Sequence, residues 1–398
     1  MRNIDKFFRQ SCYSNLRVLL TWCGIWPFHV PSKRYAIYVA FTMFCGFCIP
    51  FQTLCMIKVW PDFFEVFDCS TMLVYSLSTT IKLIYAVYKL PEIKMLLLNI
   101  REHWCSPKSD EEAKILRSHV LFARKFGYVY SGVLFVYSVI YAFTPLVARF
   151  YYNKMNSLNN TQDAETNSER QISYVLDLQI RYIPLFIQGA SAEIYFTFII
   201  SSFNVLYLMC VQHCCGLFEA LKYHLENAFE FGNNDDDIVT ISTQNNCHSN
   251  IAYGVRRHIE AVQFAVALEA LYRLPFFMHM TINVSLLSIV GSQVMTDTEN
   301  IGRLMPYGSY LSGLVLNTFF ENWQGQKIID CNEKVFNAAY NLKWYKMPIV
   351  SQKLLIMIMM RSKKPLTITA GKILVLSHMT FNTAMRTSYS YLMLLQSM

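Results

Sequence analysis

The sequence predicts an all-α protein that crosses a membrane seven times, and composition and hydropathy both lead to this fold class. Hydrophobic residues make up 54% of the 398-residue chain and charged residues only 16%, whereas a soluble domain carries about 25% charged residues. The chain contains seven apolar stretches that, as helices, are long enough to cross about 30 Å of hydrocarbon. They occupy residues 35–57, 67–88, 128–148, 183–209, 274–294, 304–320 and 368–395.

The distribution of basic residues predicts a cytoplasmic N-terminus and an extracellular C-terminus. Lys and Arg concentrate in residues 1–34 and in alternate loops, whereas the loops on the opposite side carry few, which is the pattern of the positive-inside rule. The glycosylation motif Asn159-Asn160-Thr161 lies in a predicted outer loop. We therefore expect a glycan on Asn159.

The seventh apolar stretch differs from the others because one side of its predicted helix is small or polar. The members of this stripe recur at steps of three and four residues: Ser377, Thr380, Ala384, Thr387, Tyr391 and Leu395. The opposite side carries Leu374, Val375, Met379 and Leu392. The polar side requires water or another helix, and tight helix packing in lipid is the alternative to an aqueous pathway.

Charged residues inside apolar stretches are expensive and need an explanation. Glu193 lies deep in the fourth stretch and is expected to pair across helices, whereas Lys82 can extend toward the cytoplasm. Glu269 and Arg273 are spaced for a helical ion pair. Arg386 lies in the last stretch, where sequence alone does not assign it a contact.

Motifs for enzymes and for metal or nucleotide binding are absent from the sequence. It contains no Gly-rich phosphate loop, no His-Glu-x-x-His and no Gly-x-Ser-x-Gly. The acidic run at residues 235–237 lacks the alternating ligands and the glycine of an EF-hand. We predict that the chain is not an enzyme, needs no cofactor or metal, and has no nucleic-acid partner.

Short motifs at both ends resemble those of the insect odorant receptors. At the C-terminal end these are TAGK at Thr369–Lys372, the pair Thr380-Phe381, and RTSYSY at Arg386–Tyr391, followed by Leu394-Leu395. Near the N-terminus, Gly24-Ile25-Trp26-Pro27 resembles the approach to the first span in the same family.

The resemblance implies a ligand-gated, nonselective cation channel of four subunits in the plasma membrane of olfactory sensory neurons. It implies that the last helix lines a central pore and that cytoplasmic helices form an anchor domain. The segment between the fourth and fifth spans, residues 211–273, is short. This length resembles the odorant-tuning subunit rather than the coreceptor, so the expected partners are coreceptor subunits in a heterotetramer, a small volatile ligand, cations and membrane lipid.

The same resemblance divides the chain into four parts. Residues 1–34 are expected to form a cytoplasmic segment with an amphipathic re-entrant helix, and residues 35–320 six spans with a ligand pocket. Residues 321–367 are expected to form the anchor helices, and residues 368–398 the pore-lining seventh helix. The pore and gate residues implied at its outer end are Tyr391, Leu394, Leu395, Gln396 and Ser397.

For the ligand pocket, the resemblance implies a site in the outer half of the second, third, fourth and sixth spans. Residues at helical spacing in those segments are Met72, Tyr75, Thr79, Tyr137, Tyr141, Thr144, Gln188, Ser191, Tyr195, Tyr307, Tyr310 and Leu314. Tyr307 and Tyr310 are favoured because residues three apart share a helix face. Ordinary core packing is the alternative for each of these residues.

Three other classes of protein share some of these features. A gustatory receptor of the same architecture is the nearest, although Arg386–Tyr391 resembles the odorant type more closely. A transporter would require paired halves with spans broken near the midplane. A G-protein-coupled receptor has the opposite orientation, and its Asp-Arg-Tyr and Asn-Pro-x-x-Tyr motifs are missing here.

Overall fold

The computed structural model describes residues 2–10, 13–61, 63–106, 109–158, 183–227, 241–296 and 301–397. In these ranges the chain forms helices and one two-stranded sheet, which confirms the predicted all-α class. The elements are α1 Arg2–Gln10, α2 Ser14–Trp22, α3 Pro31–Val59, α4 Phe63–Tyr88, α5 Leu90–Cys105, α6 Asp110–Leu158, α9 Ile183–Glu226, α10 Ile241–Thr296, α11 Ile301–Asn341, η1 Trp344–Lys346, α12 Ile349–Lys363, β1 Thr369–Ala370, β2 Leu374–Val375 and α13 His378–Ser397.

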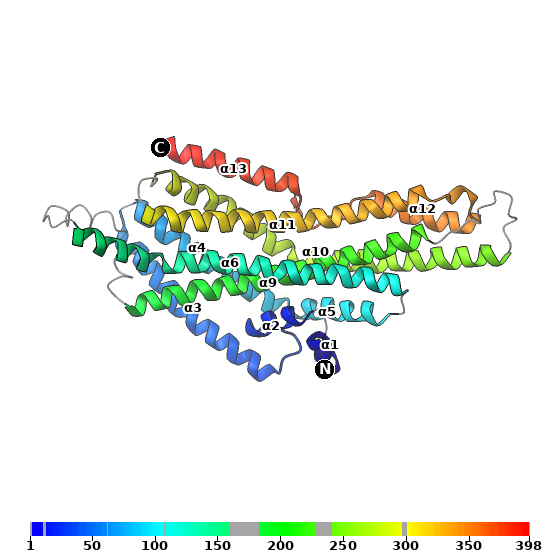
Figure 1. Cartoon of the computed structure of the whole chain (residues 1–398), viewed down its shortest axis with the longest axis horizontal. Helices are drawn as coiled ribbons and strands as arrows, with labels where there is room; N and C mark the ends of the chain where they lie inside the picture. The colour runs from blue at the N-terminus through cyan, green and yellow to red at the C-terminus, as the bar shows by residue number, and fades with distance from the viewer. Residues whose placement is uncertain are drawn as a thin grey trace.

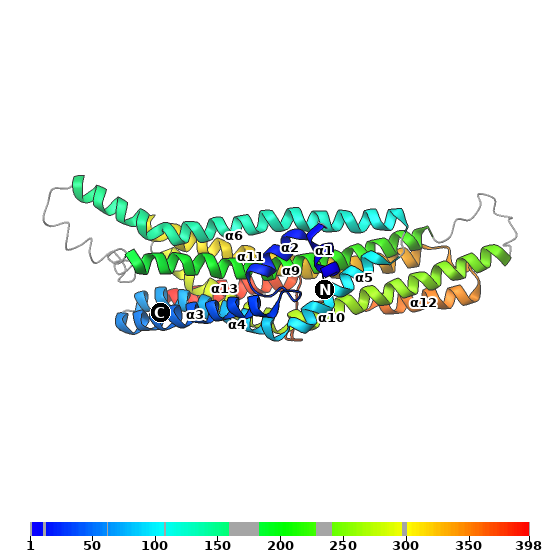
Figure 2. The ribbon, with the colours of Figure 1, turned by 90° about the horizontal axis from the view of Figure 1, so that it is seen from below.

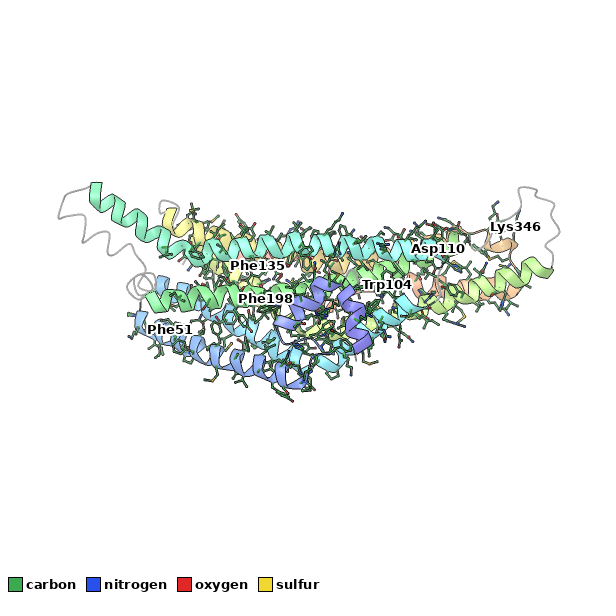
Figure 3. The ribbon with its side chains drawn as sticks, turned by 60° about the horizontal axis from the view of Figure 1, so that its bottom comes forward. Phe51, Trp104, Asp110, Phe135, Phe198 and Lys346 are labelled. Atoms are coloured by element: carbon green, nitrogen blue, oxygen red, sulfur yellow. The ribbon has the colours of Figure 1, made fainter. Side chains whose placement is uncertain are left out.

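The long helices run along the long axis of the molecule (Figure 1). Helices α6, α9, α10 and α11 extend over most of its length, and the view from below shows the same arrangement (Figure 2). Helices α3, α4 and α13 lie toward one end, which we call the α13 half, and α5 and α12 lie toward the other, the α12 half. Phe135 and Phe198 mark the first half, and Asp110 and Lys346 mark the second (Figure 3).

Four helical segments in the described ranges are long and apolar enough to cross a membrane. They are Pro31–Lys58, Asp110–Thr144, Gly189–Glu226 and Cys247–Met295. The remaining predicted spans correspond to α4, α11 and α13, with 26, 41 and 20 residues. At about 1.5 Å per residue, even the shortest of these reaches about 30 Å.

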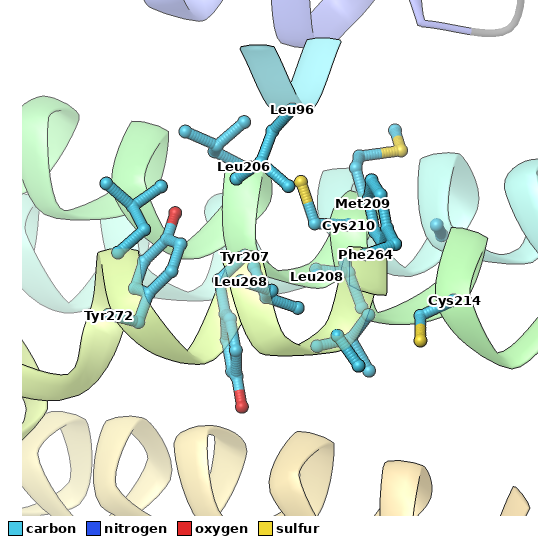
Figure 4. Packing of buried hydrophobic residues seen from close by; sticks show 14 of the residues in the cluster. Leu96, Leu206, Tyr207, Leu208, Met209, Cys210, Cys214, Phe264, Leu268 and Tyr272 are labelled. Atoms are coloured by element: carbon cyan, nitrogen blue, oxygen red, sulfur yellow. The ribbon is translucent and has the colours of Figure 1, made fainter. Parts of the chain in front are cut away.

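The hydrophobic core is built around α9. Residues 206–210 are consecutive, and each is at most 2% exposed, so this part of the helix is surrounded on all sides. Leu96 of α5 and Phe264, Leu268 and Tyr272 of α10 pack around it (Figure 4). Helix α9 therefore fixes the relative positions of the helices that surround it.

The final helix begins later than we predicted. We expected a helix from Ile368, but Thr369 pairs with Val375 and Ala370 with Leu374 in an antiparallel hairpin. Gly371 and Lys372 have positive φ angles of 65° and 62°, a left-handed conformation that a right-handed helix cannot contain. The TAGK motif consequently forms the first strand and the start of the turn of this hairpin, and α13 starts at His378.

Helix α13 packs on α10 through a stripe of buried residues. Ala384, Ser388 and Leu392 are buried and four residues apart, and the Ser288 hydroxyl donates a hydrogen bond of 3.1 Å to the Ser388 carbonyl. Leu392 was predicted to lie opposite Ala384, which is wrong, because both belong to this buried stripe. Arg386 and Tyr389 are exposed.

Candidate functional site

A cavity that is partly open to solvent, with about 660 Å³ of empty volume, lies among five helices in the α13 half. Its wall contains Tyr75 and Ser78 of α4; Leu134, Tyr137, Ser138 and Tyr141 of α6; Glu193, Thr197 and Ile200 of α9; His279, Ile282, Asn283 and Leu286 of α10; and Ser309, Tyr310, Gly313, Leu314 and Asn317 of α11.

Tyrosine rings form one side of this cavity. The rings of Tyr75 and Tyr310 lie 6.1 Å apart and meet edge to face, and those of Tyr141 and Tyr310 lie 5.6 Å apart. The Tyr75 hydroxyl is hydrogen-bonded to Thr197 at 3.0 Å. The rings offer apolar faces, so a ligand packed against them gains dispersion and burial energy without requiring a specific polar group.

Polar groups in another part of the wall belong to a buried network. Asn204 and Tyr130 both donate to the Asn317 side-chain oxygen, at 2.6 and 2.7 Å. The Asn317 nitrogen therefore faces His279 Nε2, at 3.0 Å. His279 Nε2 accepts a hydrogen bond from the Asn317 amide, so the proton of the neutral His279 ring lies on Nδ1. Nδ1 is 2.8 Å from the Glu321 carboxylate and donates to it. The network connects α6, α9, α10 and α11 at the cavity wall.

A second, smaller cavity, with about 310 Å³ of empty volume that includes open space, adjoins the first. Ser78, His279 and Ile282 line both cavities. Lys82 lines the smaller one and is 9% exposed.

Helix α11 connects the larger cavity to the start of α13. The Ser377 amide donates to the Asn322 side-chain oxygen at 3.3 Å, and the His378 amide donates to the Gln326 side-chain oxygen at 3.5 Å. Amides in the first turn of a helix have no partner within that helix, so α11 supplies acceptors for them. Asn322 and Gln326 follow the cavity residue Asn317 by one to three turns of α11.

The structure brings some of the predicted pocket residues together and separates others. Tyr75, Tyr137, Tyr141, Tyr310 and Leu314 line the larger cavity. The residues outside its wall are Met72, Thr79, Thr144, Ser191, Tyr195 and Tyr307. The Gln188 side chain lies outside the described part of the structure.

Local contacts explain several of these positions. The hydroxyls of Thr79 and Thr144 donate to carbonyls one turn earlier in their own helices, at 2.9 and 2.8 Å. The Tyr195 ring packs instead against Phe41 and Phe44 of α3. Of the favoured pair, Tyr310 therefore lines the cavity and Tyr307 does not.

The predicted ligand pocket did not include the fifth span, which lies in α10. In the structure, α10 supplies four residues to the wall of the larger cavity. A sequence signal for it was present, because His279 and Asn283 are polar residues four apart within an apolar span. Such residues face the protein interior rather than lipid. Glu193 was identified as a buried charge, but the expected partner across helices is not seen in the described residues.

The expected ion pair between Glu269 and Arg273 does not form. Glu269 instead accepts a hydrogen bond from the Thr369 hydroxyl of the hairpin. The Arg273 carbonyl accepts from the Gly371 amide at 2.9 Å. Both residues therefore connect α10 to the hairpin, because the turn brings its polar groups against that helix.

The predicted gate residues lie at the end of α13. Tyr391 and Leu394 are 53% and 57% exposed, and Leu395 is half-buried. The Gln396 amide contacts the Met295 sulfur at 3.1 Å, and the Ser397 hydroxyl donates to the Leu394 carbonyl. The predicted glycosylation site, Asn159, lies outside the described residues.

Comparison with curated proteins finds odorant receptors of flies and mosquitoes. Odorant receptor 22c of Drosophila melanogaster is 23% identical over 190 residues, which cover 48% of this chain and 46% of the relative. The chain thus spans about half the length of that relative. Odorant receptor 13a of the same species is 22% identical over 372 residues, with 88% of this chain and 84% of the relative covered.

Comparison with solved structures finds the same fold. The olfactory receptor OR5 of Machilis hrabei in complex with eugenol matches with a TM-score of 0.73 and 12% identity. The match covers 96% of this chain and 97% of that one. The family model described as 7tm Odorant receptor matches residues 62–389. The chain therefore belongs to the insect odorant receptor family, whose members are helical, multi-pass membrane receptors rather than enzymes.

Proposed function

We propose that the chain is the odorant-tuning subunit of a ligand-gated, nonselective cation channel in olfactory sensory neurons. A small volatile molecule binds in the cavity among α4, α6, α9, α10 and α11. Coreceptor subunits complete a tetramer whose central pore is lined by α13. One observation carries the gating part of the proposal: α11 forms cavity wall at Asn317 and hydrogen-bonds the start of α13 through Asn322 and Gln326.

A ligand in this cavity can shift α13 through that connection. Contacts with Tyr310, Leu314 and Asn317 favour one position of α11, and a different position of α11 moves the acceptors of the Ser377 and His378 amides. A ligand shifts such an equilibrium only by its difference in affinity for the two positions.

The exposed side of α13 supports its assignment to the pore. Tyr391 and Leu394 face away from the rest of the subunit, so they can meet neighbouring subunits or a central pathway. A ring of apolar side chains at Leu394 closes a narrow pore by excluding water. Leu395, Gln396 and Ser397 complete the outer mouth, with the N-terminus cytoplasmic and the α12 half forming the anchor.

The fold likeness to OR5 supports a small organic ligand. That receptor was solved in complex with eugenol. A cavity lined by tyrosine rings and aliphatic side chains is suited to a ligand of this kind.

Recording currents from cells that express the chain with and without an odorant coreceptor tests this function. We expect an odorant panel to evoke a cation current only when both are present. Odorant responses that require G-protein signalling would contradict the proposal, as would silence from a complex shown to be at the cell surface.

A further inference from the structure

Three polar groups from three different helices reach the larger cavity without a hydrogen-bond partner in the described structure. The Tyr310 hydroxyl of α11 and the Ser138 hydroxyl of α6 are buried and make no hydrogen bond. The Glu193 carboxyl of α9 lines the same cavity and makes neither a hydrogen bond nor an ion pair with any described residue. Buried polar groups are nearly always bonded, so the two hydroxyls, together with the half-buried Glu193 carboxyl in the same wall, indicate what the cavity contains when occupied.

Neighbouring polar residues of the wall are already satisfied, which singles these groups out. Ser78 and Ser309 donate to carbonyls of their own helices, at 2.9 and 2.8 Å. Thr197 bonds Tyr75, and Asn283 donates to Thr318 at 3.0 Å. Because these side chains already make hydrogen bonds within the protein, they determine the shape of the cavity and offer little further hydrogen bonding to a ligand.

The Glu193 carboxyl group determines which hydrogen-bonding group the preferred ligand carries. The Glu193 carboxyl keeps an oxygen that accepts hydrogen bonds whether it is ionised or protonated, whereas the hydroxyls of Tyr310 and Ser138 can donate or accept. An acceptor oxygen in an apolar cavity is stabilised by an N–H or O–H donor, and none of the ion pairs among the described residues includes Glu193. A ligand group that donates therefore satisfies the acceptor that the protein leaves unpaired.

We infer that the cavity selects small apolar molecules that carry one hydrogen-bond donor, a hydroxyl or an amine, which donates to the Glu193 carboxyl. The carbon skeleton of the ligand packs against Tyr75, Tyr141 and Leu314. This inference rests on the proposed odorant-receptor function and names the ligand class of that site.

Matched ligands on shared carbon skeletons test the inference. Phenylethyl, hexyl and cyclohexyl skeletons are each applied as alcohol, amine, methyl ether, methyl ketone and hydrocarbon, to the chain expressed with its coreceptor. We expect the alcohol or the amine to be the most potent member, by about tenfold or more over the methyl ether. Equal potency of ether and alcohol overturns the inference, and so does a preference for ketones, in which the acid would be the donor.

Variants of Glu193 identify the residue responsible. Glu193→Leu is expected to remove the preference for donors while responses to ethers and hydrocarbons persist. Glu193→Gln keeps an acceptor oxygen but no charge, so it distinguishes the two donors: an amine loses most of its potency and an alcohol loses little. Glu219→Gln is the matched control, because Glu219 is on the same helix outside the cavity, where it pairs with Lys222.

The outcomes separate this inference from the proposed function. If no ligand evokes a current in the wild-type complex at the cell surface, the channel function fails. If ligands evoke currents but Glu193→Leu changes all of them equally, the donor inference fails alone. Surface labelling of each variant accompanies the recordings, and the wild-type series decides the ligand class even if a variant does not reach the surface.

Discussion

At the scale of single residues, contacts between distant positions determine what a side chain does. Asp5 is an example, because both its oxygens accept from Arg17, at 2.7 and 3.0 Å, and one also accepts from Trp26 at 3.2 Å. Sequence shows that these residues are charged or aromatic but not that they meet. Glu193 shows the same limitation, since its burial was predictable and its lack of a partner was not.

We expect Asp5→Asn to lower stability by about 1 kcal/mol at neutral pH, because the bidentate contact is partly exposed. The hydrogen bond from Arg17 is the main cause that lowers the pKa of Asp5 below its ordinary value. A lowered pKa contributes stability at neutral pH that is lost as pH falls below about 4. Thermal unfolding of the purified protein should show a smaller acid-induced loss in Asp5→Asn than in the wild type.

Asp110→Asn is the control for this prediction, since Asp110 is an exposed carboxylate at the start of α6. Equal pH profiles for Asp5→Asn and wild type would show that the contact with Arg17 contributes nothing to folding.

Leu394→Ala should raise the current in the absence of ligand. The smaller side chain widens and wets the proposed constriction, and the dewetting barrier falls. Resting conductance in cells that also express the coreceptor measures the effect, with the neighbouring Met393→Ala as control. An unchanged resting conductance would argue against Leu394 as the gate.

At the scale of elements, the hairpin between α12 and α13 determines where the last helix begins. Its turn requires left-handed conformations at Gly371 and Lys372, and its backbone bonds α10 through the Arg273 carbonyl. The hydropathy profile includes residues 369–375 in the last apolar stretch. Mean hydropathy cannot separate a hairpin from a helix, because both can contain the same apolar residues. A glycine in an apolar segment was the available local signal for a turn.

Two substitutions in this turn should have opposite effects. Gly371→Ala introduces a Cβ 2.8 Å from the Phe277 ring at a positive φ, so we expect a loss of about 1–2 kcal/mol. Lys372→Gly removes strain at φ 62° and should leave stability unchanged or slightly raised. Thermal unfolding measures the stability of both variants. An equal loss of stability in Gly371→Ala and Lys372→Gly would contradict the left-handed turn at these two residues.

Asn322→Ala should separate ligand binding from channel opening. It removes the acceptor of the Ser377 amide and lies outside the wall of the larger cavity. We expect the maximal odorant current to fall severalfold, with a smaller change in the concentration for half-maximal response.

Asn332→Ala serves as the matched control, because Asn332 is also buried on α11 but donates to the Ser362 carbonyl at the end of α12. If both variants reduce the maximal current equally, general destabilisation explains the loss, and the connection between α11 and α13 does not carry gating.

At the scale of the whole molecule, four long helices join the two halves. Helix α9 is buried along much of its length, and α6, α10 and α11 surround it, so a ligand in the α13 half acts on elements that continue into the α12 half. The cavity is one consequence of this packing, because five helices spread between Phe63 and Asn341 contribute to its wall.

An agonist that binds this cavity should raise the unfolding temperature of the purified protein. Binding to the folded state alone adds about 2.7 kcal/mol when free ligand is a hundred times the dissociation constant. The alcohol and the methyl ether of one skeleton provide an internal comparison, and stabilisation by both to the same extent would contradict donor selection by Glu193.

The sequence by itself determined the all-α class, the positions of the apolar helices and the family resemblance. These depend on local composition and periodicity, which a single chain displays directly. Together with the family resemblance, which implies where the pocket lies, helical spacing also indicated Tyr75, Tyr141 and Tyr310 as pocket residues.

Only the tertiary structure decided which side chains share the cavity, that α10 contributes to it, and that the segment before α13 turns back as a hairpin. Each of these depends on contacts across long sequence separations: Tyr75 meets Tyr310, and Gly371 meets Arg273. Such contacts depend on the orientation of each helix about its axis and on how the helices pack against one another. The hydropathy of a single segment does not determine that orientation.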